Sequence, residues 1–430
     1  MRILIVSSSA WRQDCSFGNT FSNWFENMQD IKIANIYLDG NIPDKNEYVT
    51  DFFQISEKKV IKSVFKRKLK TWHRFSNNEI EKMTEGETKK EVSLMPFVRR
   101  SRWTIFFIIR KILWFFGRWK SKELFDFVEE FKPDIIFQPI YHRSAANKIA
   151  LTIYKKYNIP MVGFVGDDVY TLKQYSLSPL FWIDRLINRR GVRKLIKCCK
   201  FLYVATDFQK REYEKIFKLP IKTLMKFGNF EKEQQTIILH EPVKFVYTGN
   251  IDKGRYKALV HLVQTLKQLR RGVLDVYSKT ELSQKQIKAL NVEGVSRFLG
   301  GISYKEVCDA QREADVLVFA ESMRLKGKLQ VRQSFSTKLV DYFAIPRCIL
   351  AIGPKDIAPI EYLRENDAAV ICSDYFKLTQ QLGDLLSNPD KICHYADNAW
   401  VLGKKRHEKS VMQTLLREDL ERVATLNNKW

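Results

Sequence analysis

Lys338 stands where a lysine can bind phosphate, at the start of a short predicted helix that leads into a strand. The stretch "STKLVDYFAIP" (336–346) offers helix caps, an apolar face and a proline that ends the helix before the apolar strand "CILAIG". A helix N-terminus presents unpaired N–H groups and a partial positive charge, which favour a bound anion. The position predicts a phosphate contact, and an ordinary surface lysine is the alternative.

Arg255 occupies a comparable position earlier in the chain. The stretch "VYTGNIDKGRYKAL" (246–259) reads as a strand, a glycine-rich turn and a helix. Gly249 and Gly254 let the backbone approach a ligand closely, and the arginine that opens the helix could bind a diphosphate through two hydrogen bonds. A plain strand–helix turn is the alternative for this stretch alone. Two cations at two such junctions of one sheet predict a diphosphate site, with Gly249 and Asn250 contributing to it.

A pair of carboxylates marks a second candidate site. In "VGFVGDDVYTL" (162–172), a buried strand ends in Gly166 and is followed by Asp167 and Asp168. Adjacent residues leave a strand end in different directions, so we do not expect the two to act as an acid pair. Both are catalytic candidates, and Asp167 is favoured for the cleft because it directly follows Gly166. A turn in which the aspartates only cap the next element is the alternative.

Strands and helices alternate along most of the 430 residues, a length that suits two domains. The first series includes the strands "RILIVSS", "KIANIYL", "PDIIFQPI", "MVGFVG" and "FLYVATD", and the second includes "VKFVYTG", "VLDVYS", "VSRFLGG" and "DVLVFAE". This pattern predicts an α/β fold of two doubly wound, Rossmann-like domains, each with a parallel sheet covered on both faces. Ligands then bind in the cleft at the carboxyl ends of the strands.

A polar stretch over 230–242 separates the two series. We predict a first domain over 1–235, a second over 240–400, and a C-terminal helix over 401–430, for which crossing back to the first domain is one option. An N-terminal turn at Gly18-Asn19-Thr20 is expected to precede the first helix.

Composition limits the classes of function. The net charge of +24 indicates an anionic partner. No zinc-finger, RRM or helix-turn-helix pattern is present, so we do not expect nucleic acid, and no GxGxxG motif follows a strand as in a dehydrogenase. The seven cysteines are scattered without metal-ligand spacing, which indicates reduced thiols, a cytoplasmic chain and no bound metal.

Residues 58–120 carry a net charge of +13 and four of the nine tryptophans, namely Trp72, Trp103, Trp114 and Trp119. Within this segment, "RWTIFFIIRKILWFFGRWK" (102–120) predicts an amphipathic helix. Its apolar face holds Ile105, Ile108, Ile109, Ile112, Phe115, Phe116 and Trp119. Arg110 and Lys111 interrupt the apolar run, which argues against a spanning helix and favours one that lies in the interface of an anionic membrane. A core helix packed on the first sheet is the alternative.

The second half resembles the donor domain of GT-B glycosyltransferases, of the kind found in glycosyltransferase family four. Three stretches carry the resemblance in the family's order: "FVYTGNIDKGRYKAL", "FLGGISYKEVCDAQREADVLVFAES" and "STKLVDYFAIPRCILAIGP". The resemblance covers roughly residues 243–372 well and the first half loosely. It implies a GT-B fold, with the first domain serving the acceptor and the second the nucleotide-sugar donor, and no metal or other cofactor beyond the nucleoside-diphosphate sugar that serves as substrate.

The resemblance also implies roles for single residues. Arg255 and Lys338 would bind the donor diphosphate, helped by the backbone N–H groups of Thr337 and Leu339. Gly18 and Asn19 stand where relatives have a glycine-rich loop against the donor.

This sequence departs from the family at two glutamate positions, which are Gln333 and Asp341 here. Asp341 could still accept hydrogen bonds from ribose hydroxyls, while Gln333 is an uncharged candidate for the sugar. Glu321, at a strand end, could bond a sugar hydroxyl or cap a loop.

The expected activity is therefore transfer of a sugar from a nucleoside-diphosphate sugar to a glycan or lipid-linked acceptor, as a hexosyltransferase-like enzyme with retention of configuration. The expected place is the inner face of the membrane, with peripheral attachment, in assembly of bacterial envelope polysaccharide. A nucleotide-sugar epimerase of the same fold and a non-catalytic nucleotide-sugar-binding subunit are the alternatives.

Overall fold

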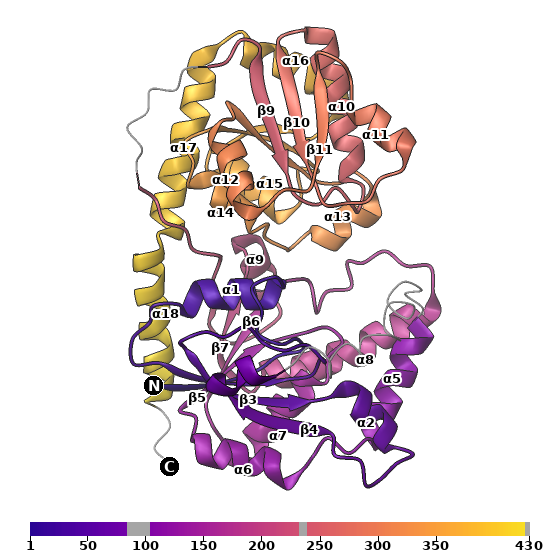
Figure 1. Ribbon diagram of the computed structural model, residues 1–430, viewed down its shortest axis with the longest axis vertical. Coiled ribbons are helices and arrows are strands. Elements are labelled where there is room, and N and C mark those ends of the chain that lie inside the picture. Colours follow the sequence, from indigo (N-terminus) through magenta and orange to yellow (C-terminus); the bar gives the residue numbers. More distant parts are fainter. Residues whose placement is uncertain (84–103, 232–238, 426–430) are drawn as a thin grey trace.

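The computed structural model describes residues 1–83, 104–231 and 239–425, and within them the chain forms two α/β domains (Figure 1). The first contains an eight-stranded sheet in the order β4-β3-β2-β1-β5-β6-β7-β8. Its neighbouring strands run parallel, except that β4 is antiparallel to β3. The strands are β1 (Arg2–Val6), β2 (Lys32–Tyr37), β3 (Val49–Ile55), β4 (Trp72–Ser76), β5 (Ile135–Pro139), β6 (Met161–Val165), β7 (Cys199–Val204) and β8 (Ile221–Thr223).

The described helices of this domain lie on both faces of the sheet. They are α1 (Ser16–Phe25), α2 (Glu57–Ser63), the 3-10 helix η1 (Asn77–Lys82), α5 (Thr104–Phe116), α6 (Lys122–Phe131), α7 (Ala146–Tyr157), α8 (Pro179–Ile196) and α9 (Asp207–Glu214). Sequence reasoning did not place β3 and β4, which lie partly within the basic segment.

The second domain is built on a six-stranded parallel sheet in the order β11-β10-β9-β12-β13-β14. Its strands are β9 (Val243–Thr248), β10 (Gly272–Tyr277), β11 (Ser296–Gly300), β12 (Val316–Ala320), β13 (Cys348–Ile352) and β14 (Val370–Cys372). Its helices are α10 (Arg255–Leu269), α11 (Gln284–Leu290), α12 (Tyr304–Arg312), α13 (Leu325–Val331), α14 (Lys338–Phe343), α15 (Ala358–Glu365), α16 (Tyr375–Leu386) and α17 (Pro389–His407).

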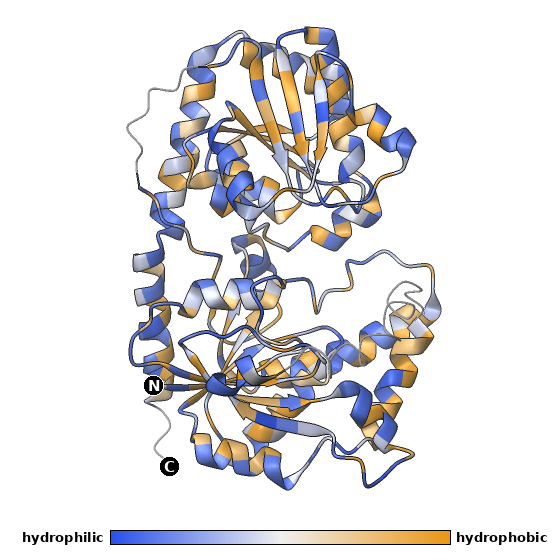
Figure 2. Ribbon diagram, in the orientation of Figure 1, coloured by the Kyte–Doolittle hydropathy of each residue, from blue (hydrophilic) through white to orange (hydrophobic). Residues whose placement is uncertain are grey.

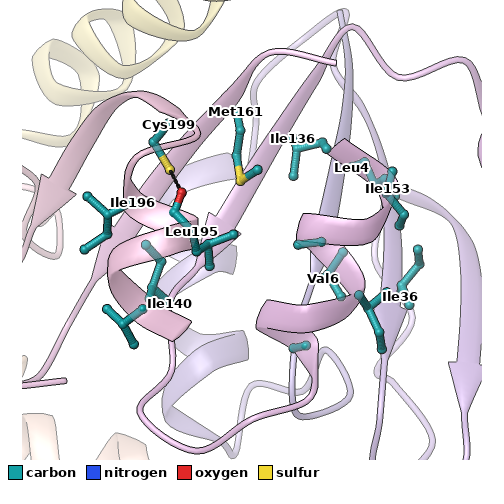
Figure 3. Close-up of a cluster of buried hydrophobic side chains, with 14 of the residues drawn as sticks. Leu4, Val6, Ile36, Ile136, Ile140, Ile153, Met161, Leu195, Ile196 and Cys199 are labelled. Atoms are coloured by element: carbon teal, nitrogen blue, oxygen red, sulfur yellow. Dashed lines mark hydrogen bonds between the residues drawn. The ribbon is translucent and has the colours of Figure 1, made fainter. Parts of the chain in front are cut away.

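Each sheet separates two hydrophobic clusters, which is why the strands read as nearly continuous apolar runs. In β1, Leu4 and Val6 join one cluster, drawn in Figure 3, while Ile3 and Ile5 join the other. Successive side chains of a strand point to opposite faces, so one strand supplies both cores. The structure confirms the predicted α/β fold with two parallel-sheet domains.

The chain returns to the first domain at its C-terminal end (Figure 1). Helix α17 packs against β13 and α14, and α18 (Lys409–Ala424) packs against β5 and β6. The Tyr203 hydroxyl donates to Asp419 over 2.7 Å, which fastens α18 to β7. Between the two helices, the N–H of Lys409 donates to the carbonyl of Gly228 over 2.9 Å. The two places where the chain crosses between domains are therefore bonded to each other.

Helix α5 differs in part from the prediction for 102–120. It ends at Phe116, and the following Gly117 packs so closely on α2 that an added Cβ would lie 2.6 Å from a Val60 methyl. Trp119 is buried, so it does not belong to the exposed apolar face, and Trp103 lies outside the described residues. Among the helices that the structure describes, none is long and apolar enough to span a bilayer.

Candidate functional site

Residues from both sheets line a cleft at the carboxyl ends of the strands. One cavity, of about 360 Å³, is bounded by Asp167 and Gln174 after β6, by Arg255 after β9 and by Glu321 after β12. Loops at this edge come from neighbouring strands, which is the position where doubly wound sheets bind ligands. Side chains that are far apart in sequence thus face one cavity.

Arg255 and Glu321 form a two-point ion pair in this cavity. The arginine Nε lies 3.0 Å from Glu321 Oε2, and its Nη2 lies 2.6 Å from Oε1. The remaining amino group, Nη1, is 3.4 Å from the carbonyl of Asn250. Glu321 therefore orients Arg255, which is a different role from the predicted contact with a sugar hydroxyl.

Lys338 is the first residue of α14, as predicted, and its ammonium group is buried near the loop after β9. Its Nζ donates to the Thr248 carbonyl over 2.7 Å and lies 4.6 Å from the centroid of the Tyr247 ring. Gly249 has a φ of 120°, and a Cβ there would lie 2.6 Å from this Nζ. Only glycine combines that backbone conformation with the close approach.

The electrostatic surroundings of Lys338 favour a bound anion. Burial, with the nearby charge of Arg255 as the next cause, lowers the pKa of Lys338 to about 8. Arg255 is paired with Glu321, whereas Lys338 forms no ion pair with a carboxylate of the described residues. An anion placed here would stabilise the charged form of the lysine further, because an opposite charge favours the protonated amine.

The two backbone groups that were predicted to help Lys338 have different surroundings. The N–H of Leu339 donates to the Ser336 carbonyl over 3.0 Å in the ligand-free protein, and its contact with a diphosphate stays a prediction. Thr337 precedes α14 without a side-chain cap bond and lines the first-domain side of the cleft.

A cavity of about 760 Å³ continues from the loop after β9. Gly249 and Asn250 form one side of it, and residues that follow β10 and β11 form the other, namely Ser278, Lys279, Thr280, Gly301 and Ile302. Gly301 and Ile302 belong to the stretch "FLGGIS", whose family resemblance implies a base-binding strand and turn, whereas Ser278, Lys279 and Thr280 were not singled out from the sequence. The signal was available, since "YSKT" and "GGIS" directly follow predicted strands of the same parallel sheet and must reach the same edge.

Asp341 lies in a neighbouring cavity of about 840 Å³ between the domains. It accepts from Lys226 Nζ over 2.8 Å, and its charge raises the pKa of Tyr304 to about 12. Tyr304 borders both this cavity and the one beside Thr280. Asp341 therefore faces ligand space, as its predicted ribose contact requires, although it already has a lysine partner.

The two aspartates after β6 have different surroundings. Asp168 is buried and accepts from the N–H of Thr171 at 2.8 Å, from Arg185 at 3.0 Å and from Arg332 at 3.4 Å. Both carboxylate oxygens of Asp168 already accept hydrogen bonds within the protein. The structure therefore indicates capping and ion pairing for Asp168 in place of the predicted catalytic role. Asp167 is exposed at the cavity of Arg255, where it accepts from the Ser334 hydroxyl.

Gln333 is fully buried in a contact between the domains, so its prediction as a sugar-binding residue is wrong. Its side chain accepts from Gln209 at 3.3 Å and donates to Glu212, and its carbonyl accepts from Thr206 at 3.2 Å. All three partners belong to α9 or its cap. An uncharged amide suits this position, because it can both donate and accept in a buried network.

The predicted turn at Gly18 and Asn19 is also wrong, because both residues lie inside α1. The helix begins at Ser16, with the Cys15 thiol accepting from the Gly18 N–H at 3.3 Å. A Cβ on Gly18 would lie 2.0 Å from the Arg12 carbonyl oxygen, so this glycine permits close packing of the preceding loop. Asn19 lines the cavity that contains Asp341, rather than a loop at the diphosphate side.

A further cavity, of about 460 Å³, lies on the first-domain side of the cleft. Aromatic residues of α1, Phe17, Phe21 and Trp24, line it together with Phe164 and Asp167. This aromatic wall was not foreseen from the sequence, where the helix was recognised but its inward face was not assigned to a ligand.

Within the described ranges, no three His, Cys, Asp or Glu side chains gather in a way that could hold a metal ion. The absence of a metal cofactor stays a prediction.

Known structures share this architecture. Sucrose-phosphate synthase from Thermosynechococcus elongatus matches 99% of this chain and 100% of its own, with a TM-score of 0.61 and 10% identity. Anabaena HepE in complex with UDP matches 98% and 100%, with a TM-score of 0.62 and 11% identity. A mutant O-GlcNAc transferase of Thermobaculum terrenum matches 99% and 67%, with a TM-score of 0.53 and 10% identity.

These likenesses define the class of fold: the chain has the two-domain GT-B architecture. Neither a scan against models of known families nor a search of curated proteins finds a match. The prediction of a GT-B fold is confirmed, and membership of glycosyltransferase family four stays a prediction.

Proposed function

We propose that this protein is a glycosyltransferase that takes its sugar from a nucleoside-diphosphate sugar. The observation that carries the proposal is the half-buried cationic pair of Arg255 and Lys338 at the loop after β9, in which Glu321 is bonded to Arg255. The adjoining cavity of about 760 Å³ offers space for a nucleoside. The HepE structures with UDP and with UDP-glucose support uridine diphosphate as the first ligand to test.

The two cations have a clear chemical task in such a reaction. When the bond between sugar and diphosphate breaks, negative charge builds up on the leaving diphosphate, and positive groups already in place stabilise it. Arg255 is pre-oriented by Glu321, so less is lost in ordering its side chain when the ligand binds.

Asp167 is the group that we assign to the acceptor side. It shares a cavity with Arg255 but belongs to the opposite domain. A carboxylate there can accept a hydrogen bond from an acceptor hydroxyl and help to place it beside the sugar. We propose transfer with retention of configuration by a hexosyltransferase and assign no protein nucleophile.

For the acceptor, we propose a glycan or a lipid-linked intermediate of bacterial envelope polysaccharide assembly, used at the inner face of the membrane. The basic and aromatic segment 58–120 supports this choice, because a basic apolar surface suits anionic lipid.

Binding and product analysis test the proposal in sequence. Unfolding of the protein is followed with UDP, GDP and ADP, and a ligand at a hundred times its dissociation constant should add ~3 kcal/mol of stability. The stabilising nucleotide is then supplied as its nucleotide sugars together with candidate acceptors. Transfer to the acceptor supports the proposal, conversion of the sugar into its epimer indicates an epimerase, and binding without turnover indicates a non-catalytic subunit.

A further inference from the structure

Helices α5 and α8 lie at one side of the first domain (Figure 1), and the hydropathy colouring shows hydrophobic residues on both (Figure 2). Large apolar side chains of both helices are exposed. Twelve of them, each at least 40% exposed, come from α5, α8 and the loop between β6 and α8. They are Ile105, Ile109, Ile112, Phe115 and Phe116 on α5, Leu172, Tyr175 and Leu177 in the loop, and Leu180, Ile183, Leu186 and Ile187 on α8. We call this set the apolar surface. Contiguous exposed patches of this kind mark interaction sites in proteins of known function.

Helices α5 and α8 are fixed to each other by their other faces. The Arg143 guanidinium lies between the rings of Phe107 and Phe181, at 4.6 and 5.8 Å from their centroids, and is paired with Asp184 on α8. Lys111 on α5 donates to Asn188 on α8 over 3.2 Å. The two helices therefore present the apolar surface as one unit.

The contact between α5 and α2 shows that the apolar surface is not a core face. Trp114 is buried on the inner side of α5, and its Nε1 donates to Glu57 over 3.0 Å. Arg110 is paired with the same carboxylate. The inner face of α5 thus holds Arg110 and Trp114, whereas Ile105, Ile109, Ile112, Phe115 and Phe116 are exposed. A core position for this apolar face, the alternative considered from the sequence, is wrong.

The charges around the apolar surface are one-sided. Helices α2, α5 and α8 contain two acidic residues, Glu57 and Asp184, and each is paired with an arginine. Exposed basic residues lie at the end of α2, in the segment that follows it and along α8, namely Lys62, Lys66, Arg67, Lys68, Lys70, Arg190, Arg193 and Lys194. An apolar surface bordered by uncompensated positive charge is complementary to a bilayer with anionic head groups.

The loop between β6 and α8 connects the apolar surface to the cleft. Gln174 borders the cavity of Asp167 and Arg255 and donates to Asp168 over 3.2 Å, whereas Tyr175 and Leu177 are exposed. The Trp182 indole donates to the Ser176 carbonyl over 3.0 Å, which holds this loop against α8. A bilayer that contacts Leu177 would therefore lie beside the mouth of the cleft.

From these contacts we propose that α5, α8 and the 172–177 loop form one docking surface for an anionic bilayer, with the cleft opening beside the membrane. The proposal deepens the proposed function, on which it rests for the acceptor, by naming the side from which a membrane-bound acceptor arrives. Docking itself depends on the apolar surface and not on the nucleotide site, so the two can fail separately.

Flotation of the full chain with phosphatidylcholine vesicles of graded phosphatidylglycerol content tests the docking. We expect binding that rises with phosphatidylglycerol and falls with salt. Three variants each remove one part of the surface: Ile109→Ser/Ile112→Ser/Phe115→Ser, Leu172→Ser/Tyr175→Ser/Leu177→Ser and Ile183→Ser/Leu186→Ser/Ile187→Ser. Each should bind anionic vesicles at least tenfold more weakly.

The matched control is Leu299→Ser/Phe376→Ser/Val401→Ser, which removes exposed apolar side chains of the second domain and should float like the parent. UDP affinity and melting temperature are measured for every protein. The vesicle binding of a variant is compared with that of the parent when both values equal those of the parent, because the variant is then correctly folded. Parent protein that ignores anionic vesicles overturns the proposal. Surface variants that float like the parent overturn it too, as does a parent that dimerises through this surface without lipid. UDP binding that fails while vesicle binding persists would instead remove the proposed function.

Discussion

Glu321 holds Arg255 by two hydrogen bonds, of 3.0 and 2.6 Å, at the cavity shared by the two domains. The glutamate is 4% exposed and the pair is largely enclosed, so the guanidinium plane is fixed before any ligand arrives. Removing either partner would leave a buried charge without its counterpart. The cationic pair of Arg255 and Lys338 is thus supported by a carboxylate that does not itself need to touch the sugar.

The first prediction concerns this cationic pair. Arg255→Ala and Lys338→Ala should each weaken UDP binding by ~1.5–3 kcal/mol, the value of a lost charge-assisted hydrogen bond. Isothermal titration calorimetry measures the change, and Lys285→Ala, an exposed lysine of α11, should bind UDP like the parent. Equal affinity of both variants and the parent for UDP, GDP and ADP would remove the diphosphate assignment.

The second prediction is a pH dependence of nucleotide binding. The pKa of Lys338 is lowered to about 8 by burial, so the amine of the free protein is charged below that pH and neutral above it. A bound diphosphate favours the charged form and raises the pKa, so UDP affinity should be highest at pH 7 and lower by about twofold at pH 8. It should then fall by up to about tenfold per pH unit above 8.

A Lys338→Met variant separates this effect from other titrating groups. It should bind UDP weakly and with the same affinity from pH 7 to 10. The terminal phosphate of the ligand is ionised throughout this range, since such groups have a pKa of ~6. A parent affinity that does not change between pH 8 and 10 would show that the lysine is not part of the binding site.

The third prediction separates the two aspartates after β6. Asp168→Asn should lower the free energy of unfolding by ~3–5 kcal/mol, because it breaks a buried pair with Arg185 and leaves that arginine uncompensated. Asp167→Asn should leave stability within ~0.5 kcal/mol of the parent, since Asp167 is exposed, and should lower transfer more than UDP binding.

Urea unfolding and a transfer assay on the same preparations make this comparison. If Asp167→Asn transfers sugar as fast as the parent, the cleft aspartate has no part in the reaction. If Asp168→Asn is as stable as the parent, the ion pair with Arg185 contributes less than its burial indicates.

Lys338 and Gln333 show which features of the site can be predicted from the sequence and which cannot. The helix that carries Lys338 is determined by local features, namely a cap residue, a proline and the strand that follows. These features can be recognised in the sequence. Gln333 is only five positions away, but its role depends on Gln209 and Glu212 of the other domain. Contacts between domains leave no periodic signal, and for that reason the sugar role for Gln333 was wrong.

The same distinction explains Gly18 and the exposed α5. The glycine was read as a turn residue, because turns are where glycine is most often needed, whereas here it admits the Arg12 carbonyl to a helix surface. For α5, the sequence predicts an amphipathic helix from its period. It does not show which face of that helix packs against the domain. That choice depends on Glu57 of α2, which draws in Arg110 and Trp114.

The last prediction uses His407, which is buried where the chain passes between domains. Its Nε2 is 2.9 Å from the Tyr362 hydroxyl and its Nδ1 is 3.0 Å from the Lys226 carbonyl, a pattern that fits the neutral ring. Burial lowers the pKa of His407 to about 4, below its value in the unfolded chain. The unfolded state therefore binds more protons between these values. The histidine's contribution to stability is complete above pH ~6.5 and is lost as the pH falls toward 4.

Replacing His407 by Gln should reduce the slope of unfolding free energy against pH by ~1 kcal/mol per pH unit between pH 5 and 6.5, the range in which an unfolded histidine gains its proton. Urea unfolding at several pH values in this range measures the slope, and because the variant and the parent share every carboxylate, the difference between their slopes reports the histidine. The matched control is His394→Gln, at an exposed histidine that contacts Asp367 on the surface, which should not reproduce this loss of slope. A His407→Gln slope equal to that of the parent would mean that the ring takes up its proton without leaving its place between Tyr362 and Lys226, and that the crossing between the domains tolerates a charged imidazole.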